Sequence, residues 1–406
     1  MRNHRRTRVP TLLYVLVLAL SPSSPARTIS VDDDGPADFA TIQAAIDAAL
    51  DGDTVIVQPG AYTGAGNRDI SFQGKAITMR GADPNDANVV ESTVVDCGAG
   101  MGDLHRGFAF TSGEGPDSRL EGFAIQNGWS EGGGAILCVQ SSPTIGKCLI
   151  RDNYSGYTSA HPIRSDPNLP AEAAWNGGGI NACQDSSPMI VDCVLENNHA
   201  ESGGGIYVSD SSRIAVMGCK IRSNEATHVG GGLGCGGYGN QTGGVIRDCI
   251  VAGNRAAEGG GIFCSRNEPL ISGCIIAHNL ATTEPIDLDR RSGGGGIMCY
   301  QSNPTFVNCT IVGNHANASG GGINCPSGGG VVLLENCIIW GNSATYGDQL
   351  ARLCGMCVVG SQQIELTHCC IEMNPGTLFA ERNNEWETGN TWTIDLDAQH
   401  STDADP

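Results

Sequence analysis

The chain has 406 residues, with 43 acidic against 23 basic side chains and a formal net charge of −20. An acidic surface repels polyanions, which argues against nucleic acid and anionic lipid as partners. No segment approaches the roughly 20 consecutive apolar residues that a membrane-spanning helix needs. We therefore expect a protein that does not bind nucleic acid and does not span a membrane.

Residues 1–26 have the pattern of a secretory signal. Four arginines among the first eight residues precede an apolar run at 12–20, and Ser24, Pro25 and Ala26 form a small-residue exit. Cleavage before Arg27 would leave 19 basic against 43 acidic residues, a formal charge of −24. The sequence thus predicts a secreted or cell-surface protein.

Residues 27–119 are predicted to form an N-terminal cap and the first coils of a longer structure. Apolar residues at Ile42, Ala45, Ile46 and Ala49 follow a helical period, which predicts one short amphipathic helix within 38–51. Such a helix would cover the open end of a sheet. The predicted strands that follow are 54–57, 76–80, 93–96 and 107–110, with a turn at Pro59-Gly60.

Residues 120–375 contain a pattern that recurs eight times: an apolar residue, two variable positions, Cys, one variable position, an aliphatic residue, two variable positions, Asn. Such self-similarity is typical of a solenoid, in which each unit buries its apolar face against its neighbours. The repeated residues are Cys148, Cys193, Cys219, Cys249, Cys274, Cys309, Cys337 and Cys369, with Asn153, Asn198, Asn224, Asn254, Asn279, Asn314, Asn342 and Asn374.

Seven glycine triplets, each followed by an apolar residue, occur from residue 132 onward, and each precedes one of the patterns, as at 177–179 and 203–205. Cys and the aliphatic residue two positions later would share the inner face of a strand. The apolar residue three before Cys breaks this alternation, which predicts a bend between them. We expect each Asn to adopt the left-handed conformation at a corner, and its side chain to hydrogen-bond along the solenoid axis.

Two solenoids share this kind of pattern, and the return segments distinguish them. Leucine-rich repeats need a packed return segment at a period of 20–29 residues. The units here are 25 to 45 residues apart, and their return segments are glycine-rich and unsuited to a helix. The sequence therefore favours an all-β fold, a parallel β-helix solenoid with a short N-terminal capping helix.

The eighteen cysteines allow two interpretations. Their regular positions suit a stack of small apolar core residues, whereas an exported protein also permits disulfides between adjacent rungs, which lie about 4.8 Å apart. A second series follows the glycine runs at Cys138, Cys183, Cys235, Cys264, Cys299 and Cys325, with Val208 in place of one cysteine, so that Cys138 and Cys183 stand together.

Two long insertions interrupt the repeat, and both leave after the corner Asn of a unit. They separate Asn153 from Gly177 and Asn279 from Gly293, four rungs or about 19 Å apart. Loops on a rigid solenoid are common binding sites. The candidate ligand-binding residues are Tyr157, His161, Arg164, Trp175, Asp287, Asp289, Arg290 and Arg291. Tyr157 and Trp175 suit either stacking on a sugar ring or anchoring of the insertion to the solenoid wall.

Metal and redox sites have little support in the sequence. The histidines at 199, 228, 278 and 315 do not converge in the repeat, and the Cys354–Cys357 pair has no partner with suitable spacing. The recurrent Asp of calcium-binding nonapeptide repeats is missing from the glycine runs. We therefore predict no metal and no cofactor, although the acidic surface leaves calcium binding open.

The glycine-rich units alternating with apolar-x-x-Asn units resemble the repeats of chlamydial-type polymorphic outer membrane proteins over about residues 120–375. Those proteins are bacterial surface adhesins carried by a C-terminal membrane barrel, for which the predicted tail at 376–406 is too short. Residues 39–62 are similar to the start of right-handed β-helix proteins of the pectin lyase-like superfamily. The resemblance implies a right-handed β-helix. The catalytic motifs of its esterases, lyases and polygalacturonases are missing, and its catalytic residues are unknown.

These observations lead to two functional hypotheses. The first is a secreted or cell-surface, non-enzymatic β-helix that binds a surface polysaccharide or another component of a cell surface. The second is a polysaccharide-active enzyme, similar to pectate lyases, that acts on acidic polysaccharide through the two insertions. Residues 402–406 resemble a point from which such bacterial proteins continue, so we expect the chain to be truncated. The oligomeric state does not follow from the sequence.

Overall fold

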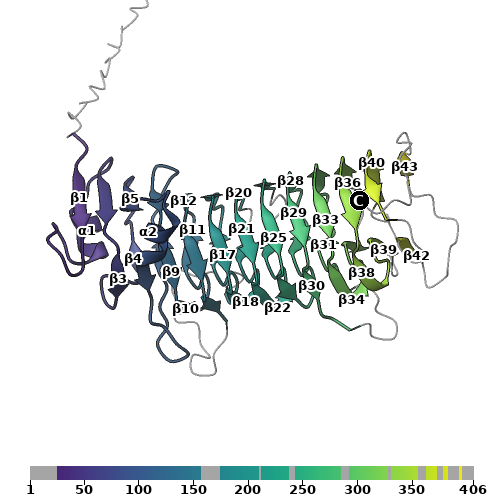
Figure 1. Cartoon of the computed structure of the whole chain (residues 1–406), viewed down its shortest axis with the longest axis horizontal. Helices are drawn as coiled ribbons and strands as arrows, with labels where there is room; N and C mark the ends of the chain where they lie inside the picture. The colour runs from purple at the N-terminus through teal and green to yellow at the C-terminus, as the bar shows by residue number, and fades with distance from the viewer. Residues whose placement is uncertain are drawn as a thin grey trace, which may run out of the picture.

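The protein is a long parallel β-helix, as the sequence predicts. The computed structural model describes residues 25–156, 174–209, 212–236, 243–284, 292–327, 331–354, 363–372, 378–382 and 393–395. Within them the chain winds in coils that stack along one axis, and the strands of successive coils form four parallel sheets. The coils follow one another from the N-terminus to the C-terminus in Figure 1. Neither of the two short helices in these residues has the length and apolarity to cross a membrane.

The sheets are numbered here in the order in which each coil visits them. Sheet 1 contains β1 (Thr28–Val31), β2 (Thr54–Val57), β5 (Thr78–Gly81), β8 (Arg119–Glu121), β12 (Thr144–Gly146), β16 (Met189–Val191), β20 (Ala215–Met217), β24 (Val245–Arg247), β28 (Leu270–Ser272), β32 (Thr305–Val307), β36 (Val331–Glu335), β40 (Gln363–Thr367) and β43 (Thr393–Asp395). Sheet 2 contains β3 (Gly60–Thr63), β6 (Thr93–Asp96), β9 (Ala124–Gln126), β13 (Leu149–Arg151), β17 (Val194–Glu196), β21 (Lys220–Arg222), β25 (Ile250–Ala252), β29 (Ile275–Ala277), β33 (Thr310–Val312), β37 (Ile338–Trp340) and β41 (Cys370–Ile371).

The other two sheets complete each coil. Sheet 3 contains β10 (Trp129–Ser130), β14 (Tyr154–Ser155), β18 (His199–Ser202), β22 (Glu225–Val229), β26 (Arg255–Ala256), β30 (Leu280–Ala281), β34 (His315–Ser319) and β38 (Ser343–Tyr346). Sheet 4 contains β4 (Ile70–Ser71), β7 (Phe108–Phe110), β11 (Ile136–Val139), β15 (Ile180–Cys183), β19 (Ile206–Val208), β23 (Leu233–Cys235), β27 (Ile262–Ser265), β31 (Ile297–Tyr300), β35 (Ile323–Ser327), β39 (Leu350–Cys354) and β42 (Leu378–Arg382).

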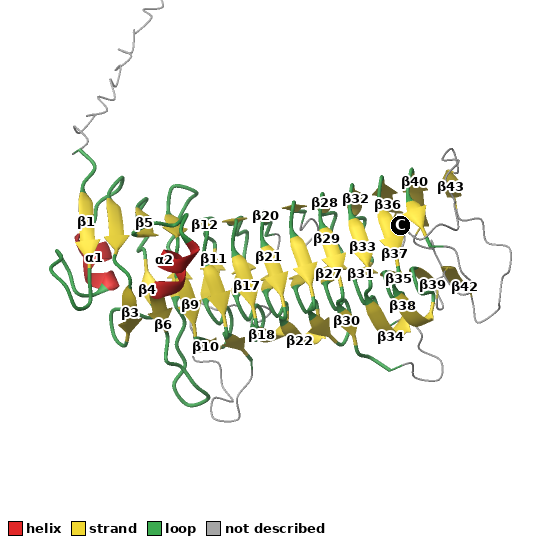
Figure 2. Cartoon of the chain, in the orientation of Figure 1, coloured by secondary structure: helices red, strands yellow, loops and turns green. Residues whose placement is uncertain are grey.

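The N-terminal helix α1 (Ile42–Ala48) packs against β1, β2 and β4 at the first coil, where Figure 2 shows it at the end of the solenoid. It is shorter than the predicted 38–51 because Thr41 and Ala49 both have extended dihedral angles. Its predicted apolar face is buried. A second helix, α2 (Ala87–Ser92), was not predicted; it begins where the Asp86 side chain accepts a hydrogen bond from the Asn88 amide, and it packs against β6 and β9.

The first coils differ from the rest because they have no strand in sheet 3, which begins only at β10. Large aromatic side chains fill the interior there. Phe72 lies 4.9 Å from Phe110, and Phe108 lies 6.3 Å from Phe123, measured between ring centroids. All four rings are fully buried. The N-terminal coils are thus three-sided with an aromatic core.

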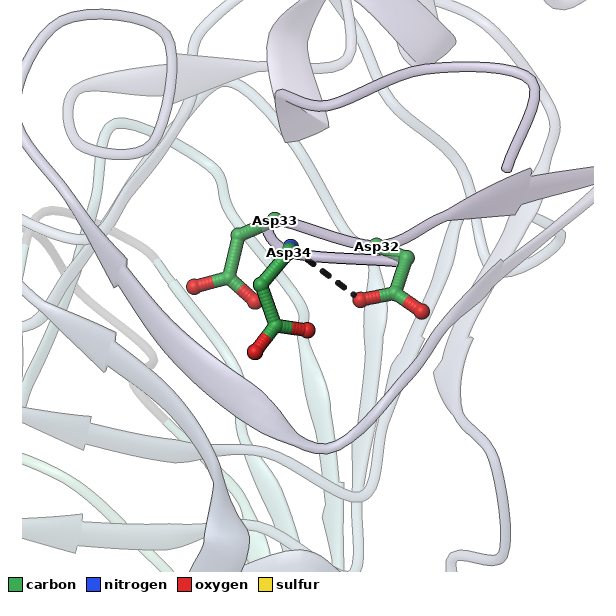
Figure 3. Close-up of side chains that lie close together, drawn as sticks. All are labelled: Asp32, Asp33 and Asp34. Atoms are coloured by element: carbon green, nitrogen blue, oxygen red, sulfur yellow. Dashed lines mark hydrogen bonds between the residues drawn. The ribbon is translucent and has the colours of Figure 1, made fainter. Parts of the chain in front are cut away.

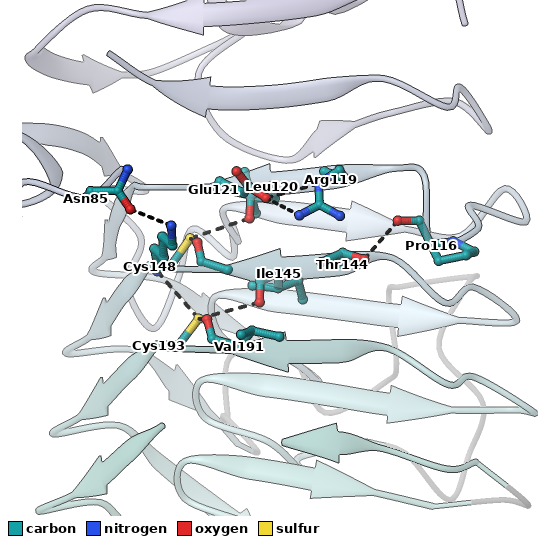
Figure 4. Close-up of polar contacts among 12 residues, drawn as sticks. Asn85, Pro116, Arg119, Leu120, Glu121, Thr144, Ile145, Cys148, Val191 and Cys193 are labelled. Atoms are coloured by element: carbon teal, nitrogen blue, oxygen red, sulfur yellow. Dashed lines mark hydrogen bonds and ion pairs between the residues drawn. The ribbon is translucent and has the colours of Figure 1, made fainter. Parts of the chain in front are cut away.

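The corner between sheets 1 and 2 is a single left-handed residue followed by the repeated Cys. The eight left-handed residues are Lys147, Asp192, Gly218, Asp248, Gly273, Asn308, Asn336 and His368. This confirms the predicted bend before Cys. Each thiol is within 3.2–3.4 Å of the carbonyl two residues before it, and within 3.4–3.9 Å of a carbonyl in the preceding coil. Figure 4 shows both contacts at Cys193, to Val191 and Ile145.

The corner between sheets 2 and 3 holds the repeated Asn. Each Asn Nδ2 donates to the Oδ1 of the next Asn along the axis at 2.9–3.1 Å, from Asn153 as far as Asn342. It also donates to a carbonyl of the preceding coil, as Asn198 does to Ile150 at 2.9 Å. The left-handed residue is the one before each of these asparagines, so our prediction that Asn itself takes that conformation was wrong. The Oδ1 and Nδ2 atoms of these asparagines both make hydrogen bonds within the ladder. Asn374 lies outside the described residues.

The corner between sheets 3 and 4 is formed by the glycine triplets rather than by strands. The first glycine of most triplets is left-handed, as at Gly177 with φ of 65°, and in 132–134 the left-handed residue is Gly133. A Cβ on the second, Gly178, would lie 2.5 Å from the Gly204 carbonyl oxygen of the next coil. A side chain at the second glycine would therefore collide with the next coil, which explains why glycine recurs there.

The inner face of sheet 4 carries most of the second cysteine series. Cys235 pairs in register with Cys264, and Cys264 with Cys299. Cys183 is an exception, because Ala182 rather than Cys183 lies beside Cys138. Our grouping of Cys138 with Cys183 in one ladder was wrong: Cys183 is three residues after Ile180, whereas Cys138 is two after the paired Ile136, so the two side chains point to opposite faces. The sixteen cysteines with described side chains are all free thiols, and burial raises the pKa of Cys235 to about 12. This favours the stacked-thiol interpretation.

Candidate functional site

The two insertions leave the solenoid at one corner, as predicted. Each follows a strand of sheet 3, namely β14 or β30, and these strands are four steps apart in that sheet. Most of the predicted binding residues lie outside the described residues: Tyr157, His161, Arg164, Asp287, Asp289, Arg290 and Arg291. Trp175 is the one that the structure describes.

Trp175 is partly buried against the outer surface of sheet 4. Its ring packs on a small apolar cluster that includes Leu137, Val139 and Cys183. Its amide donates to the Glu131 carbonyl, and its own carbonyl accepts from the Glu201 amide at 2.9 Å. Trp175 thus anchors the end of the first insertion to the wall, which is the second of the two roles considered for it.

Three rings stand on consecutive coils beside this anchor, and we call Trp129, Tyr154 and His199 the aromatic row. They pair in register as the first residues of β10, β14 and β18. The centroid distance is 4.2 Å from Trp129 to Tyr154 and 4.9 Å from Tyr154 to His199, and the last two rings are nearly parallel at 6°. All three are partly exposed.

The backbone of sheet 3 explains why these rings face outward. The second residue of each strand points inward and is always small, as with Ser130, Ser155 and Ala200. The first residue therefore points outward. Burial lowers the pKa of His199, partly offset by Glu225, and burial also raises the pKa of Tyr154.

A polar cluster flanks the row at its N-terminal end. His105 Nδ1 lies 2.5 Å from Asp69 Oδ2, and its Nε2 lies 3.0 Å from Asp103 Oδ1. The His105 and Trp129 backbones exchange two hydrogen bonds of 2.9 Å, which fix this cluster beside the first ring. Both carboxylates are well exposed.

Acidic side chains continue along the row. Glu201 stands two residues after His199, and Glu225 follows His199 on the next strand, whereas Glu131, two residues after Trp129, is buried. Arg255 offsets part of this charge, because it lies 3.4 Å from Glu225. The result is a strip of partly exposed rings bordered mainly by carboxylates.

The sequence analysis missed the aromatic row. The outward position is the residue directly after each ladder Asn, and it varies freely: Tyr154, His199, Glu225, Arg255, Leu280, His315 and Ser343. Rings occupy it on neighbouring coils only at the start of the series. Trp129 precedes the first repeated unit, so nothing in the pattern linked it to Tyr154. A comparison of that one position across the units could have found the row.

Among the described residues, one group of three acidic side chains could converge on a cation. Asp32, Asp33 and Asp34 follow β1 and appear together in Figure 3. Asp32 Oδ1 already accepts from the Asp34 and Gly35 amides, at 3.4 and 3.2 Å. These are the hydrogen bonds of an ordinary turn, and nothing else at the cluster indicates a bound ion.

A shallow depression of about 460 Å³ lies on the outer side of sheet 1, far along the chain from the aromatic row. Leu270, Leu333, Thr305 and Glu268 are among the residues that line it. It has no convergent set of polar groups comparable to the cluster around His105.

Comparison with known families supports the fold. A model described as a right-handed β-helix region matches residues 168–283. Together with the four parallel sheets, this match establishes an all-β, right-handed parallel β-helix. No curated protein matches the sequence. The resemblance to polymorphic outer membrane proteins therefore rests on the sequence pattern alone.

Several solved structures are similar in their winding. Pectate lyase Pel9A has 14% identity and a TM-score of 0.46, over 90% of this chain and 81% of that chain. Pectin methylesterase PemA from Erwinia chrysanthemi has 9% identity and a TM-score of 0.38, over 88% and 93%. A rhamnogalacturonan lyase has 12% identity and a TM-score of 0.35, over 88% and 85%. These values are too low to transfer an activity or a site.

Proposed function

We propose that this right-handed β-helix is a non-enzymatic, cell-surface or secreted module that binds polysaccharide through the aromatic row. The observation that supports the proposal is the placement of Trp129, Tyr154 and His199 on three consecutive coils, partly exposed and in register. Because the rings pack on one another along the axis, the row offers a sugar chain their partly exposed edges as a continuous apolar ridge. A rigid row of such rings suits an extended chain rather than one small ligand.

Polar groups beside the rings would bind sugar hydroxyls. Asp69, Asp103 and Glu201 are hydrogen-bond acceptors, and His105 is held between the first two at a fixed position. Binding sites of this kind combine apolar contact with a few oriented polar groups. Because the wall behind these groups is rigid, binding would cost little conformational entropy.

The charge of the strip narrows the ligand class. Carboxylates lie at both ends of the row, and the whole chain is acidic, with a formal charge of −20. A polyuronate would be repelled, whereas a neutral or amino-sugar polymer would not. We therefore assign neutral or amino-sugar polysaccharides to this row, in contrast to the acidic substrates of our enzymatic hypothesis. That alternative relied on Asp287, Asp289, Arg290 and Arg291, which lie outside the described residues, and it stays a prediction.

Export is part of the proposal, and the surroundings of Arg27 support it. The Arg27 amide donates to Asp53 Oδ1 at 2.8 Å, and its guanidinium lies 2.8 Å from Asp53 Oδ2. Cleavage before Arg27 would place a new ammonium group on this carboxylate. Mass spectrometry of the exported protein should find Arg27 at its N-terminus; a mature N-terminus inside β1 would contradict the proposed cleavage.

Binding can be tested with three immobilised polysaccharides: xylan as neutral, chitosan as amino-sugar and polygalacturonate as acidic. We expect retention on xylan or chitosan but not on polygalacturonate. Tyr154→Ala should weaken binding about 10-fold, in line with the loss of roughly 1–1.5 kcal/mol of ring contact. Tyr300→Ala on sheet 4 is the matched control, because that ring is also partly exposed but lies outside the row.

Two results would contradict this proposal. The first is equal binding by the Tyr154→Ala and Tyr300→Ala variants, which would exclude the row as the contact surface. The second is the appearance of unsaturated sugar products or new reducing ends from any of the polysaccharides. Product formation would establish an enzyme instead, and preference for polygalacturonate would favour our alternative hypothesis.

A further inference from the structure

Large apolar side chains are exposed on one part of the solenoid. Of the eight such side chains in the described residues, six lie on the outer faces of sheets 1 and 2 between β24 and β37. They are Val245, Leu270 and Leu333 on sheet 1, and Ile250, Ile275 and Ile338 on sheet 2, each 38–45% exposed. Clustering of this kind marks an interaction surface, whereas scattered apolar residues need no explanation.

Sheet 2 presents the more continuous of the two surfaces. We call its outward residues on β25, β29, β33 and β37 the apolar face: Ile250, Ala252, Ile275, Ala277, Thr310, Val312, Ile338 and Trp340. The face contains no charged residue over four coils, and its strands pair without a register shift. It is therefore a flat, uncharged strip along the axis.

The same side of sheet 2 is covered or charged nearer the N-terminus. Helix α2 packs on β6 and β9, and its Glu91 lies 3.5 Å from Arg151 of β13. On the next coils Arg222 lies 2.6 Å from Glu196. The chain thus protects this side of the sheet at one end, and the apolar face begins where that protection stops.

We propose that a second copy of this chain binds the apolar face, with the two solenoid axes antiparallel. A two-fold axis that runs along the strands between β29 and β33 would place β25 of one copy over β37 of the other. It would also place β29 over β33, and β21 over β41. Such a contact uses the same patch on both subunits, as most dimers do.

Side-chain size fits this alignment. Ala252 would face Trp340 of the second copy, so that the largest side chain of the face meets one of the smallest. Ile250 would face Ile338 of the second copy, and both are among the most exposed apolar residues of the chain. A two-fold axis along the solenoid would instead reverse the strands and place Trp340 over Ile338 of the same coil, so that two large side chains meet.

Charge complementarity supports the same alignment. Lys220 and Arg222 border the face at β21, while Glu372 follows β41 at its other end. Antiparallel axes bring the basic end of one copy over the acidic end of the other, and they do so twice. An unshifted parallel alignment would superimpose like charges, which is unfavourable.

The dimer should be weak. Eight side chains are fewer than the roughly 20–30 residues that each partner contributes to an interface of standard size. We therefore expect a dimer that forms in the micromolar range rather than an obligate one. Sheet 3 lies on another side of the coil, so both aromatic rows would stay accessible, and the dimer does not depend on the proposed polysaccharide binding.

Analytical ultracentrifugation of the purified protein over a range of concentrations tests the association. Wild-type protein should form dimers with increasing concentration, and Ile275→Lys should remain monomeric. Leu270→Lys is the matched control, because Leu270 is similarly exposed but lies on sheet 1. Thermal unfolding of both variants checks that the coils remain folded. A wild-type chain that is monomeric up to millimolar concentration, or an Ile275→Lys variant that still dimerises, would overturn the proposal.

Cross-linking tests the antiparallel alignment. Cys370 is exposed and would lie opposite Lys220 of the second copy, across the roughly 10 Å that separates packed sheets. A Lys220→Cys variant should therefore form covalent dimers with a short bis-maleimide reagent. The Lys220→Cys/Cys370→Ser variant should not. Covalent dimers of equal yield in the double variant would exclude this alignment.

Discussion

The N-terminal coils (residues 25–126) and the repeat coils (residues 129–372) have the same winding but are held together differently. The N-terminal coils are three-sided and are filled by Phe72, Phe108, Phe110 and Phe123. The repeat coils gain sheet 3 and have tight corners, and ladders of Cys and Asn replace the aromatic core. Large rings thus fill the coils that lack sheet 3, whereas small repeated side chains line the coils whose corners recur.

This difference also places the candidate site. The aromatic row begins at Trp129, where sheet 3 starts and the N-terminal coils are followed by the repeat coils. The connection at 97–107 belongs to the N-terminal coils and pairs with β10, which brings His105 and Asp103 beside the row. The junction of the two architectures therefore combines a regular row of positions with an irregular loop.

The largest expected effect tests the aromatic core. Phe108→Ala should lower the free energy of unfolding by about 3–5 kcal/mol, because it removes a buried ring that contacts three others. Phe306→Ala in the repeat coils is the control, since Phe306 is equally buried but has no ring partner among the described residues. Chemical denaturation should show a loss at Phe108 that is larger by about 1 kcal/mol. Equal losses would mean that the rings contribute only their buried area.

The next effect tests the ladder. Asn254→Ala should lower the free energy of unfolding by about 2–4 kcal/mol, because it leaves buried partners in Asn224, Asn279 and Ile221 unsatisfied. The neighbouring Arg255→Ala removes only an exposed ion pair and should cost less than about 1 kcal/mol. Similar values for the two variants, measured by denaturation, would show that the ladder adds little to the repeat coils.

A smaller effect is expected for the cysteines. Cys249→Ser should change the free energy of unfolding by about 1 kcal/mol or less, because a hydroxyl can donate to the same carbonyls of Arg247 and Val216. Titration of denatured, unreduced protein should count all eighteen thiols. A lower count, with a loss of about 2–5 kcal/mol in the variant, would identify rung-to-rung disulfides instead.

The smallest effect concerns His199. Burial lowers the pKa of His199 in the folded chain below its ordinary value of 6.5, so the unfolded chain binds the proton more readily. Stability should therefore fall as the pH drops from about 6.5 through the folded pKa, by less than about 1 kcal/mol. Denaturation of His199→Gln at several pH values should show a weaker dependence in this window. An unchanged slope would show that another group is responsible.

The sequence predicted the parallel stacking of the coils and much of the strand pattern for a physical reason. Cys and the aliphatic residue two positions later must both be buried in every coil, so their spacing recurs wherever the wall recurs. The strands at 54–57 and 93–96 were predicted with their observed bounds. Sheet 3 was not predicted, because several of its strands have only two residues and their inner positions are simply Ser or Ala.

The candidate site was only partly predictable. The insertions are visible as changes in spacing, so their common corner could be found. The aromatic row could not, because an outward residue is not constrained by packing and Trp129 stands before the first unit. The error at Cys183 has a related cause. Cys183 stands one residue further along its strand than Cys138, and a shift of one residue moves a side chain to the other face of a sheet. The number of cysteines does not reveal such a shift.

The asparagine ladder has a direction. Each side chain accepts a hydrogen bond from the backbone amide of the asparagine one coil earlier, as Asn254 does from the Asn224 amide at 3.0 Å. The first acceptor of this series, Asn153, protects the Gly128 amide in the same way. Damage at one coil should therefore appear in its upstream neighbour: in an Asn254→Ala chain, deuterium would enter first at the Asn224 amide. Each coil is thus completed by the coil that follows it.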